Sequence, residues 1–311
     1  SLNGNDVIYI GGVNLDRNLY AFDTSGNSRT YALTAYPNSS PAIAADGTIY
    51  IVDFNGLLHA ITDTGTTLSA AWTHATNNSA ASSPAVSPNG TKVYFGSYNQ
   101  TIGVRAVNTA APHTTWSIVT GGWTVGVAPA VDESGNIFVP CYGDKKIYGL
   151  TQTGANKWSA YPTGGKMFSS AAINSANTPI YVASDKLYAM NISNGSQKWT
   201  TPFTVAGADF LSYSPVVDAA GKIYAPCSNG NLYILQDNGT SASILASYAA
   251  DAGYTFSMPA IGSDGTIYVE STNGKLYALG VVDTTPPTLS SLILSPVSPV
   301  KAGTVTFTLT F

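Results

Sequence analysis

The chain has 311 residues, of which 44% are hydrophobic and 11% aromatic, whereas only 10% are charged. This composition is that of a globular protein and excludes a solvated, disordered chain. Lysine and arginine number 13 against 17 aspartates and glutamates, without a basic cluster, and no apolar run approaches the ~18 residues of a spanning helix. Nucleic-acid binding and a membrane span are therefore not expected.

One sequence phrase recurs along the chain, and each copy reads as several short strands. The first complete copy joins Ser-Pro-Ala at residues 40–42, an apolar stretch at 49–51 and another at 57–61. A copy without its first strand opens the chain at residues 7–22, which makes seven copies in all. The six copies that have a first strand are anchored 42 to 45 residues apart, at Pro41, Pro84, Pro129, Ala171, Pro215 and Pro259. A period in the low forties with several strands per unit is typical of a β-propeller.

The predicted fold class is all-β: a seven-bladed β-propeller of four-stranded blades, with a short C-terminal β-strand extension. Within a copy the Ser-Pro-Ala segment is the first strand, nearest the central channel, and a tryptophan marks the outer, fourth strand in four copies. Asp-Gly and Asn-Gly pairs lie between strands, where two-residue turns need a positive φ. The tryptophans expected to dock between neighbouring blades are Trp72, Trp116, Trp158 and Trp199.

Two of the tryptophan segments carry a resemblance to a known family. Residues 151–158, Thr-Gln-Thr-Gly-Ala-Asn-Lys-Trp, and residues 191–199, which end in Gly-Ser-Gln-Lys-Trp, are similar to the tryptophan-docking repeat of pyrroloquinoline-quinone (PQQ)-type propellers. The similarity covers roughly residues 3–280. The family includes quinoprotein alcohol dehydrogenases and an outer-membrane assembly lipoprotein, so the resemblance implies a fold without selecting a function.

Both ends of the chain depart from the repeat. Residues 3–280 are expected to form the propeller, although the first copy lacks an inner strand and the seventh lacks an outer one. Residues 281–311 begin with a Thr-Pro-Pro linker and end in a strict period-two alternation from Val305 to Phe311. This tail resembles the incomplete start of a bacterial Ig-like module, and the alternative is a degenerate eighth repeat. Because the chain opens at Ser1, we expect either a removed leader or an excised fragment.

Few side chains offer catalytic chemistry. Cys141 and Cys227 occupy the same position two blades apart, which places their Cα atoms roughly 16–19 Å apart, too far for a disulfide, so both are expected as free thiols. His59 replaces a third-strand tyrosine and is expected in the core or between blades. Asp53 and Glu270 are acidic where other copies are not, and we expect them at the solvent-facing rim. No catalytic residue and no metal site is predicted.

Aromatic residues recur just before the first strands, on the face where the channel opens. Together with a few interleaved polar groups they form a candidate surface for binding a protein or a glycan. The alternative is that these side chains cap the cores of the blades. The candidate residues are Tyr36, Trp123, Lys166, Phe168, Asp209, Phe210, Tyr213, Asp251, Tyr254 and Phe256.

The preferred hypothesis is a non-catalytic, extracytoplasmic interaction or scaffold module without a cofactor. It is a monomeric propeller within a larger bacterial surface or secreted protein, and it binds a protein or a carbohydrate at its channel face. The Ser/Thr/Asn-rich, charge-poor surface supports export. The alternative is a PQQ-dependent dehydrogenase that oxidises alcohols or sugars with PQQ and calcium, which the scarcity of acidic residues and the lack of adjacent cysteines disfavour. A third interpretation is a spacer without a ligand.

Overall fold

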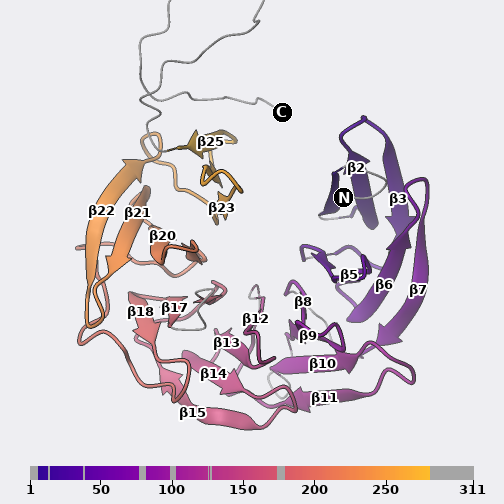
Figure 1. Ribbon diagram of the computed structural model, residues 1–311, viewed down its shortest axis with the longest axis horizontal. Coiled ribbons are helices and arrows are strands. Elements are labelled where there is room, and N and C mark those ends of the chain that lie inside the picture. Colours follow the sequence, from indigo (N-terminus) through magenta and orange to yellow (C-terminus); the bar gives the residue numbers. More distant parts are fainter. Residues whose placement is uncertain are drawn as a thin grey trace, which may run out of the picture.

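The computed structural model describes residues 6–12, 15–37, 39–76, 82–98, 103–124, 126, 128–173 and 179–280. These residues form 25 β-strands in seven antiparallel sheets and no helix. Figure 1 shows the sheets standing side by side around a common axis, in chain order from indigo to orange. The predicted seven-bladed β-propeller is therefore confirmed. The described residues contain no helix long and apolar enough to cross a membrane.

Each blade consists of consecutive strands, and neighbours in the chain are neighbours in the sheet. Blades 1 and 2 contain β1 (Val7–Gly11), β2 (Asn18–Asp23) and β3 (Ser28–Ala32), then β4 (Ala42–Ile43), β5 (Ile49–Val52), β6 (Leu57–Asp63) and β7 (Leu68–Ala75). Blades 3 and 4 contain β8 (Ala85–Val86), β9 (Lys92–Gly96), β10 (Val104–Asn108) and β11 (Thr115–Ile118), then β12 (Ala130–Val131), β13 (Ile137–Cys141), β14 (Lys146–Leu150) and β15 (Asn156–Pro162). Blades 5 to 7 contain β16 (Ala172–Ile173), β17 (Ile180–Ala183) and β18 (Leu187–Met190), then β19 (Val216–Val217), β20 (Lys222–Pro226), β21 (Asn231–Asp237) and β22 (Ala242–Ala249), then β23 (Ala260–Ile261), β24 (Ile267–Glu270) and β25 (Leu276–Leu279).

Blade 5 departs from the predicted four strands. Its sheet ends at β18, and the segment that carries Trp199 makes only isolated bridges, Gln197 to Met190 and Phe203 to Leu187. Among the described residues blade 1 lacks an inner strand and blade 7 an outer one, as the repeats predicted. The expected C-terminal strand extension lies in residues 281–311, outside the described residues.

The Asp-Gly pairs occupy the turns between first and second strands. In the turn from β4 to β5, Asp46 accepts the Thr48 amide at 3.0 Å, while Gly47 adopts a φ of 86° and donates its amide to Ala44 at 2.9 Å. Glycine adopts a positive φ without the steric cost of a Cβ. These local turns let two short strands of one blade run antiparallel.

Neighbouring blades bury apolar sheet faces against each other. In blade 2, Ile49 and Ile51 pack toward blade 1, whereas Tyr50 and Leu58 pack toward blade 3. Because successive side chains of a strand point to opposite faces, one strand contributes to two cores. Among the described residues, six such cores join each blade to the next, from blade 1 to blade 7.

The described residues contain no corresponding core between blades 7 and 1, and Figure 1 shows the ring open between β25 and β2. Ile8 and Ile10 of β1 occupy the repeat positions of Ile49 and Ile51. The blade 2 residues are 0% exposed, whereas Ile8 is 63% and Ile10 51% exposed. Across the opening, Tyr268 of β24 is also exposed. The two end blades therefore present apolar faces that the other blades bury.

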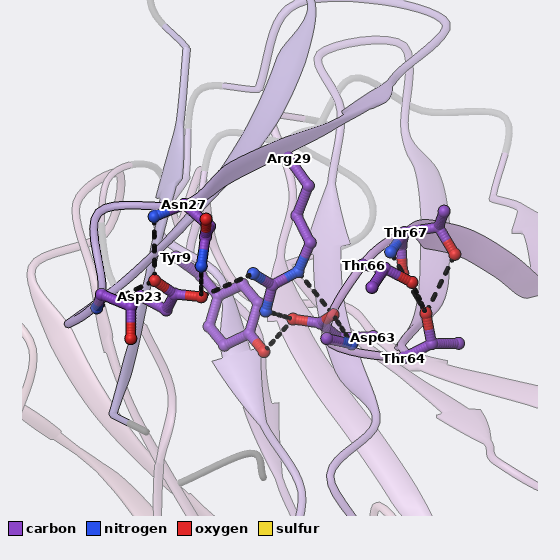
Figure 2. A network of polar contacts seen from close by, with 10 residues as sticks. Tyr9, Asp23, Asn27, Arg29, Asp63, Thr64, Thr66 and Thr67 are labelled. Atoms are coloured by element: carbon purple, nitrogen blue, oxygen red, sulfur yellow. Dashed lines mark hydrogen bonds and ion pairs between the residues drawn. The ribbon is translucent and has the colours of Figure 1, made fainter. Parts of the chain in front are cut away.

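A buried ion pair joins blade 1 to blade 2 at the rim opposite the hairpins that connect second and third strands (Figure 2). Arg29 of β3 holds Asp63 of β6 through two nitrogens, one of them Nε at 2.6 Å from Oδ1, and its Nη1 lies 3.8 Å from Asp23. Tyr9 donates its hydroxyl to the same Asp63 at 2.7 Å. Burial by itself raises the pKa of Asp63, but hydrogen bonds from Arg29, Tyr9 and the Gly65 amide outweigh it and leave that pKa below its ordinary value. Asp63 therefore stays charged and links the two blades.

The same arrangement recurs between blades 5 and 6. Asp237 of β21 takes the repeat position of Asp63, and it accepts hydrogen bonds from Tyr181 at 2.8 Å, Lys198 at 2.6 Å and the Trp199 indole at 3.1 Å. Here too burial acts to raise the pKa of the aspartate, and the three side-chain donors outweigh it. A tyrosine, a cation and an aspartate thus form an inter-blade clamp at two junctions.

The junction of blades 3 and 4 lacks this clamp. Gln152 stands at the repeat position of the clamp aspartates, while Tyr94 and Trp116 stand where blade 5 carries Tyr181 and Trp199. In the described part of the chain, the buried Tyr94 hydroxyl and Trp116 Nε1 have no hydrogen-bond partner. A buried donor without an acceptor costs ~1–3 kcal/mol, so this junction is less well satisfied than the two clamped ones.

Each of the four tryptophans expected to dock between blades contacts the blade that follows its own. The contacts are Trp72 with His113, Trp116 with Gly154, Trp158 with Ile192 and Trp199 with Asp237. The first is a ring stack with centroids 4.1 Å apart, and the third is a hydrogen bond of 3.3 Å from the indole to a backbone carbonyl. The indoles therefore add area and hydrogen bonds to the inter-blade cores.

Asp53 does not lie at the solvent-facing rim, so this sequence prediction is wrong. The carboxylate is fully buried between blades 1 and 2, where it accepts the Thr34 hydroxyl and the Ala35 amide and lies 3.2 Å from His59 Nε2. The loop that carries Thr34 and Ala35 folds over the end of β5, which the position within the repeat does not reveal. His59 is buried, as predicted, and Glu270 is exposed.

Candidate functional site: an aromatic arc on the channel face

Two segments of a blade meet on the face where the channel opens: the loop entering the first strand and the hairpin between the second and third strands. Backbone hydrogen bonds join them. In blade 2 the Phe54 amide donates to the Tyr36 carbonyl at 3.0 Å, and in blade 4 the Tyr142 amide donates to the Trp123 carbonyl at 3.0 Å. An aromatic side chain from the loop therefore lies beside one from the hairpin in both blades.

Six aromatic side chains form a continuous row on this face, which we call the aromatic arc. Along the ring its members are Tyr36, Phe54, Tyr98, Trp123, Tyr142 and Phe168. Successive ring centroids are 4.8, 6.2, 6.2, 6.3 and 4.3 Å apart. Tyr98, Trp123 and Phe168 are 37%, 36% and 41% exposed. Contiguous exposed aromatic surface of this kind marks interaction sites on proteins.

A cation, Lys166, lies over the arc. Lys166, in the loop that enters blade 5, donates to the Tyr142 hydroxyl at 2.7 Å, and its Nζ lies 4.4 Å from the centroid of that ring. This is cation–π distance. Two carboxylates in the neighbouring hairpins are engaged within the protein, since Asp144 accepts from Tyr148 and Asp185 accepts from Tyr188. Both carboxylates therefore have a tyrosine partner in their own hairpins, while Lys166 lies over the ring of Tyr142.

A close approach of two glycines positions Trp123. A Cβ on Gly143 of the β13–β14 hairpin would collide with the backbone of Gly122 and come within 2.7 Å of the Trp123 amide nitrogen. The absence of side chains at both positions lets the loop lie directly on the hairpin. Beneath the loop, Cys141 donates its thiol to the Trp123 carbonyl, with Sγ and oxygen 3.4 Å apart.

The structure separates the ten candidate face residues into three groups. The first group belongs to the arc or carries its cation: Tyr36, Trp123, Lys166 and Phe168. The second lies in the loops that enter blades 6 and 7, with no ring contact to the arc among the described residues: Asp209, Tyr213, Asp251 and Tyr254. The third is buried: Phe210 and Phe256.

Phe210 and Phe256 are not on the binding face, and for them the alternative, that the side chain belongs to a blade core, holds. Both side chains are 1% exposed and belong to the cores between blades 5 and 6 and between blades 6 and 7. Phe256 meets Tyr277 edge-on at 5.3 Å, and Phe210 lies 6.1 Å from Phe203. A count of residues before each first strand does not show which way a side chain turns, so these two were grouped with exposed neighbours.

Members of the second group make polar contacts within their own loops and hairpins. Asp251 pairs with Lys275 at 2.7 Å and accepts from Asn273 at 2.9 Å, while Tyr213 donates to Thr255 at 3.1 Å. Tyr254 is exposed beside them. The Asp251 contacts join the loop and the hairpin of blade 7, and the Tyr213 contact joins the loops that enter blades 6 and 7.

Three members of the arc were missed in the sequence: Phe54, Tyr98 and Tyr142. Each directly follows the second-strand end of its copy, after Asp53, Ser97 and Cys141 respectively. The signal was present, because an alignment of the copies places the three aromatics at one position. Only the folded ring shows that this position meets the loop aromatics of neighbouring blades.

Among the described residues the site presents neither a reactive thiol nor a group of side chains that could hold a metal ion. Burial raises the pKa of the Cys141 thiol to about 11 and also raises that of Cys227, and both cysteines are free and buried. Among the described residues no three His, Cys, Asp or Glu side chains gather in a group that could hold a metal ion. The residues present therefore do not fit a calcium ion with PQQ, and the quinoprotein alternative gains no support.

Comparisons with known proteins agree with this architecture. A family model described as outer membrane protein assembly factor BamB matches residues 55–285. A search of curated protein sequences gives no significant match. The crystal structure of BamB from Moraxella catarrhalis is similar with a TM-score of 0.66 and 16% identity, covering 88% of this chain and 81% of that one. The Dos1 propeller is similar with a TM-score of 0.67 and 12% identity, covering 85% and 72%. At these identities the likeness concerns the fold.

Proposed function

Because the chain belongs to the PQQ-type repeat family described as outer membrane protein assembly factor BamB, we propose that it is a non-catalytic protein-interaction scaffold that binds its partner through the aromatic arc. The observation that carries the proposal is the continuity of the arc. Aromatic residues supply large contact area at low conformational cost and are enriched in protein interfaces.

The repeat itself does not demand aromatics at these positions. The hairpin position of Phe54, Tyr98 and Tyr142 is aromatic in blades 2, 3 and 4 only, whereas blade 5 has Asp185 and blade 6 has Ser228 at the same place. The aromatics at this position are therefore a feature of three adjacent blades rather than of the repeat, and this supports a localised binding surface.

The proposed setting is extracytoplasmic, within a larger bacterial surface or secreted protein. The family description and the charge-poor composition support it. Residues 3–280 would form a monomeric propeller module. We propose that residues 281–311, which lie outside the described residues, begin an Ig-like module, as their sequence pattern suggests. A carbohydrate ligand is the competing occupant of the arc.

The test is to pan a displayed library of random peptides against the chain and to measure the recovered binders on variants. Trp123→Ala and Tyr98→Ala should weaken binding about tenfold or more, as truncation of central aromatic contacts commonly does. Tyr254→Ala is the matched control, because this tyrosine is similarly exposed but lies outside the arc. Peptides that bind both arc variants as tightly as the unmodified chain would overturn the proposal. A parallel screen of glycans that gives binders where the peptide library gives none would also overturn it.

A further inference from the structure

A histidine and an arginine face each other across the junction of blades 2 and 3. His74 of β7 takes the repeat position of Tyr31, and Arg105 of β10 takes that of His59. Between blades 1 and 2 the rings at these two positions meet edge-on with centroids 5.8 Å apart. The corresponding tyrosines of blades 4 and 5 lie 6.5 Å apart. The register of the strands therefore brings the imidazole of blade 2 to face the guanidinium of blade 3.

The position of Arg105 is supplied with a polar partner in other blades. In blade 2, His59 at this position lies 3.2 Å from Asp53, and in blade 5 Tyr188 donates to Asp185 at 3.0 Å. The Nε of Arg105 is buried, and in the part of the chain that the structure describes it has no hydrogen-bond partner. A buried charged group without an acceptor is costly, so this guanidinium can gain free energy from a ligand that accepts.

The charged neighbours of His74 are both basic. Burial, His113 and Arg105 together lower the pKa of His74, and no carboxylate acts on it among the described residues. Burial alone lowers the pKa of Arg105. His113, from the loop between β10 and β11, stacks on Trp72 with centroids 4.1 Å apart. The two blades thus meet here with positive charge on both sides and without a compensating acid.

The donors at this junction suit one kind of ligand. A guanidinium presents its N–H groups in a planar fork that matches two oxygens of a carboxylate, sulfate or phosphate group. A protonated imidazole donates from both of its nitrogens. His74 and Arg105 are each only partly buried, which leaves the pair in contact with solvent. An oxyanion between them accepts from both side chains and offsets the repulsion of their charges.

We propose that the junction of blades 2 and 3 is a binding site for a compact oxyanion, held between Arg105 and His74. The site shares no residue with the aromatic arc and does not depend on the proposed function. Because the protonated imidazole attracts the anion and the neutral one does not, the affinity rises as the pH falls through the titration of His74. A carboxylate group and a tetrahedral phosphate-type ion share the required chemistry, and the probes below distinguish them.

The experiment is nuclear magnetic resonance of the whole chain, in which three histidines and three arginines give few side-chain signals. Sodium sulfate and sodium acetate are titrated separately, with sodium chloride at equal ionic strength as the control. We expect saturable shifts of the His74 ring signals and of the Arg105 Nε–H signal. The bound anion should raise the pKa of His74 by at least about 0.5, and affinity at pH 6 should exceed that at pH 8 about threefold or more. Stronger binding of acetate would support a carboxylate ligand, and stronger binding of sulfate would support a phosphate-type ion.

Substitutions locate the anion on these two side chains. Arg105→Gln should weaken binding about tenfold or more, as loss of a charge-assisted hydrogen bond does. His74→Gln should abolish the dependence of affinity on pH, whether or not the first variant folds. Arg17→Gln is the matched control, because it removes an exposed arginine elsewhere, and it should change affinity less than about twofold. Shifts that chloride reproduces at equal ionic strength, or sulfate and acetate binding that Arg105→Gln leaves unchanged, would overturn the proposal.

Discussion

The open junction between blades 1 and 7 leads to a prediction with an internal control. Ile51 and Ile10 occupy the same position of their repeats, but Ile51 is fully buried between blades 1 and 2, whereas Ile10 is 51% exposed. Truncation of a fully buried isoleucine to alanine costs ~2–5 kcal/mol. Full burial of such a side chain contributes ~1.5–3 kcal/mol, so about half of that, roughly 1 kcal/mol, is at stake for Ile10.

The two variants, Ile51→Ala and Ile10→Ala, share the same change in strand propensity, up to ~1 kcal/mol, which cancels in their difference. We therefore expect Ile51→Ala to lower the free energy of unfolding by about 2 kcal/mol more than Ile10→Ala. Urea unfolding with the m-value held common measures both. Ile49→Ala and Ile8→Ala provide a second matched pair. Equal losses within either pair would show that the face of blade 1 is covered in solution, and the description of an open ring would be wrong.

Three further predictions test the junctions and the thiols. Gln152→Asp should raise the free energy of unfolding by ~1–2 kcal/mol, because it places a carboxylate where Asp237 accepts from Tyr181 and Trp199, within reach of the orphan donors of Tyr94 and Trp116; a loss of stability in urea would contradict the clamp. The pKa of Asp63 is lower in the folded chain than its ordinary value of 3.8. Its ionised form therefore stabilises the fold at pH values above 3.8, and this stabilisation is lost as the pH falls through the pKa of the folded state. Asp63→Asn should therefore lower the free energy of unfolding at neutral pH and make that free energy fall less steeply between about pH 5 and pH 2. An unchanged dependence of the free energy of unfolding on pH in this range would count against the ion pair. Because burial raises the pKa of Cys141 to about 11, a thiol reagent at neutral pH should label it only after unfolding, and rapid labelling of the native chain would contradict its burial.

The repeat pattern predicted only part of the aromatic arc. Tyr36, Trp123 and Phe168 were found because they precede first strands, yet the same reasoning selected Phe210 and Phe256, which are buried. Spacing along a chain gives the distance to a strand but not the direction of a side chain in a loop. Exposure depends on which neighbouring blade covers the residue, and that is a property of the assembled ring.

The position within a repeat also failed to reveal the surroundings of Asp53. Its copy has an acid where other copies have serine or cysteine, which suggested solvent exposure. In the folded chain the same position is buried in every complete blade that the structure describes, and the acid is accommodated by donors from Thr34 and His59. These donors come from different segments of the chain, so no local pattern points to them.

The amino-acid sequence by itself determined the number of repeats, their turns and their strands apart from the outer strand of blade 5. These depend on alternation, on Asp-Gly pairs such as Asp46 and Gly47, and on a period of 42 to 45 residues, all of which act over short distances along the chain. The tertiary structure decided which blade faces are buried, which aromatics join into the arc, and that Ile8 and Ile10 are exposed where their counterparts in blade 2 are buried. Each of these depends on surfaces that come together only when the blades assemble around their axis.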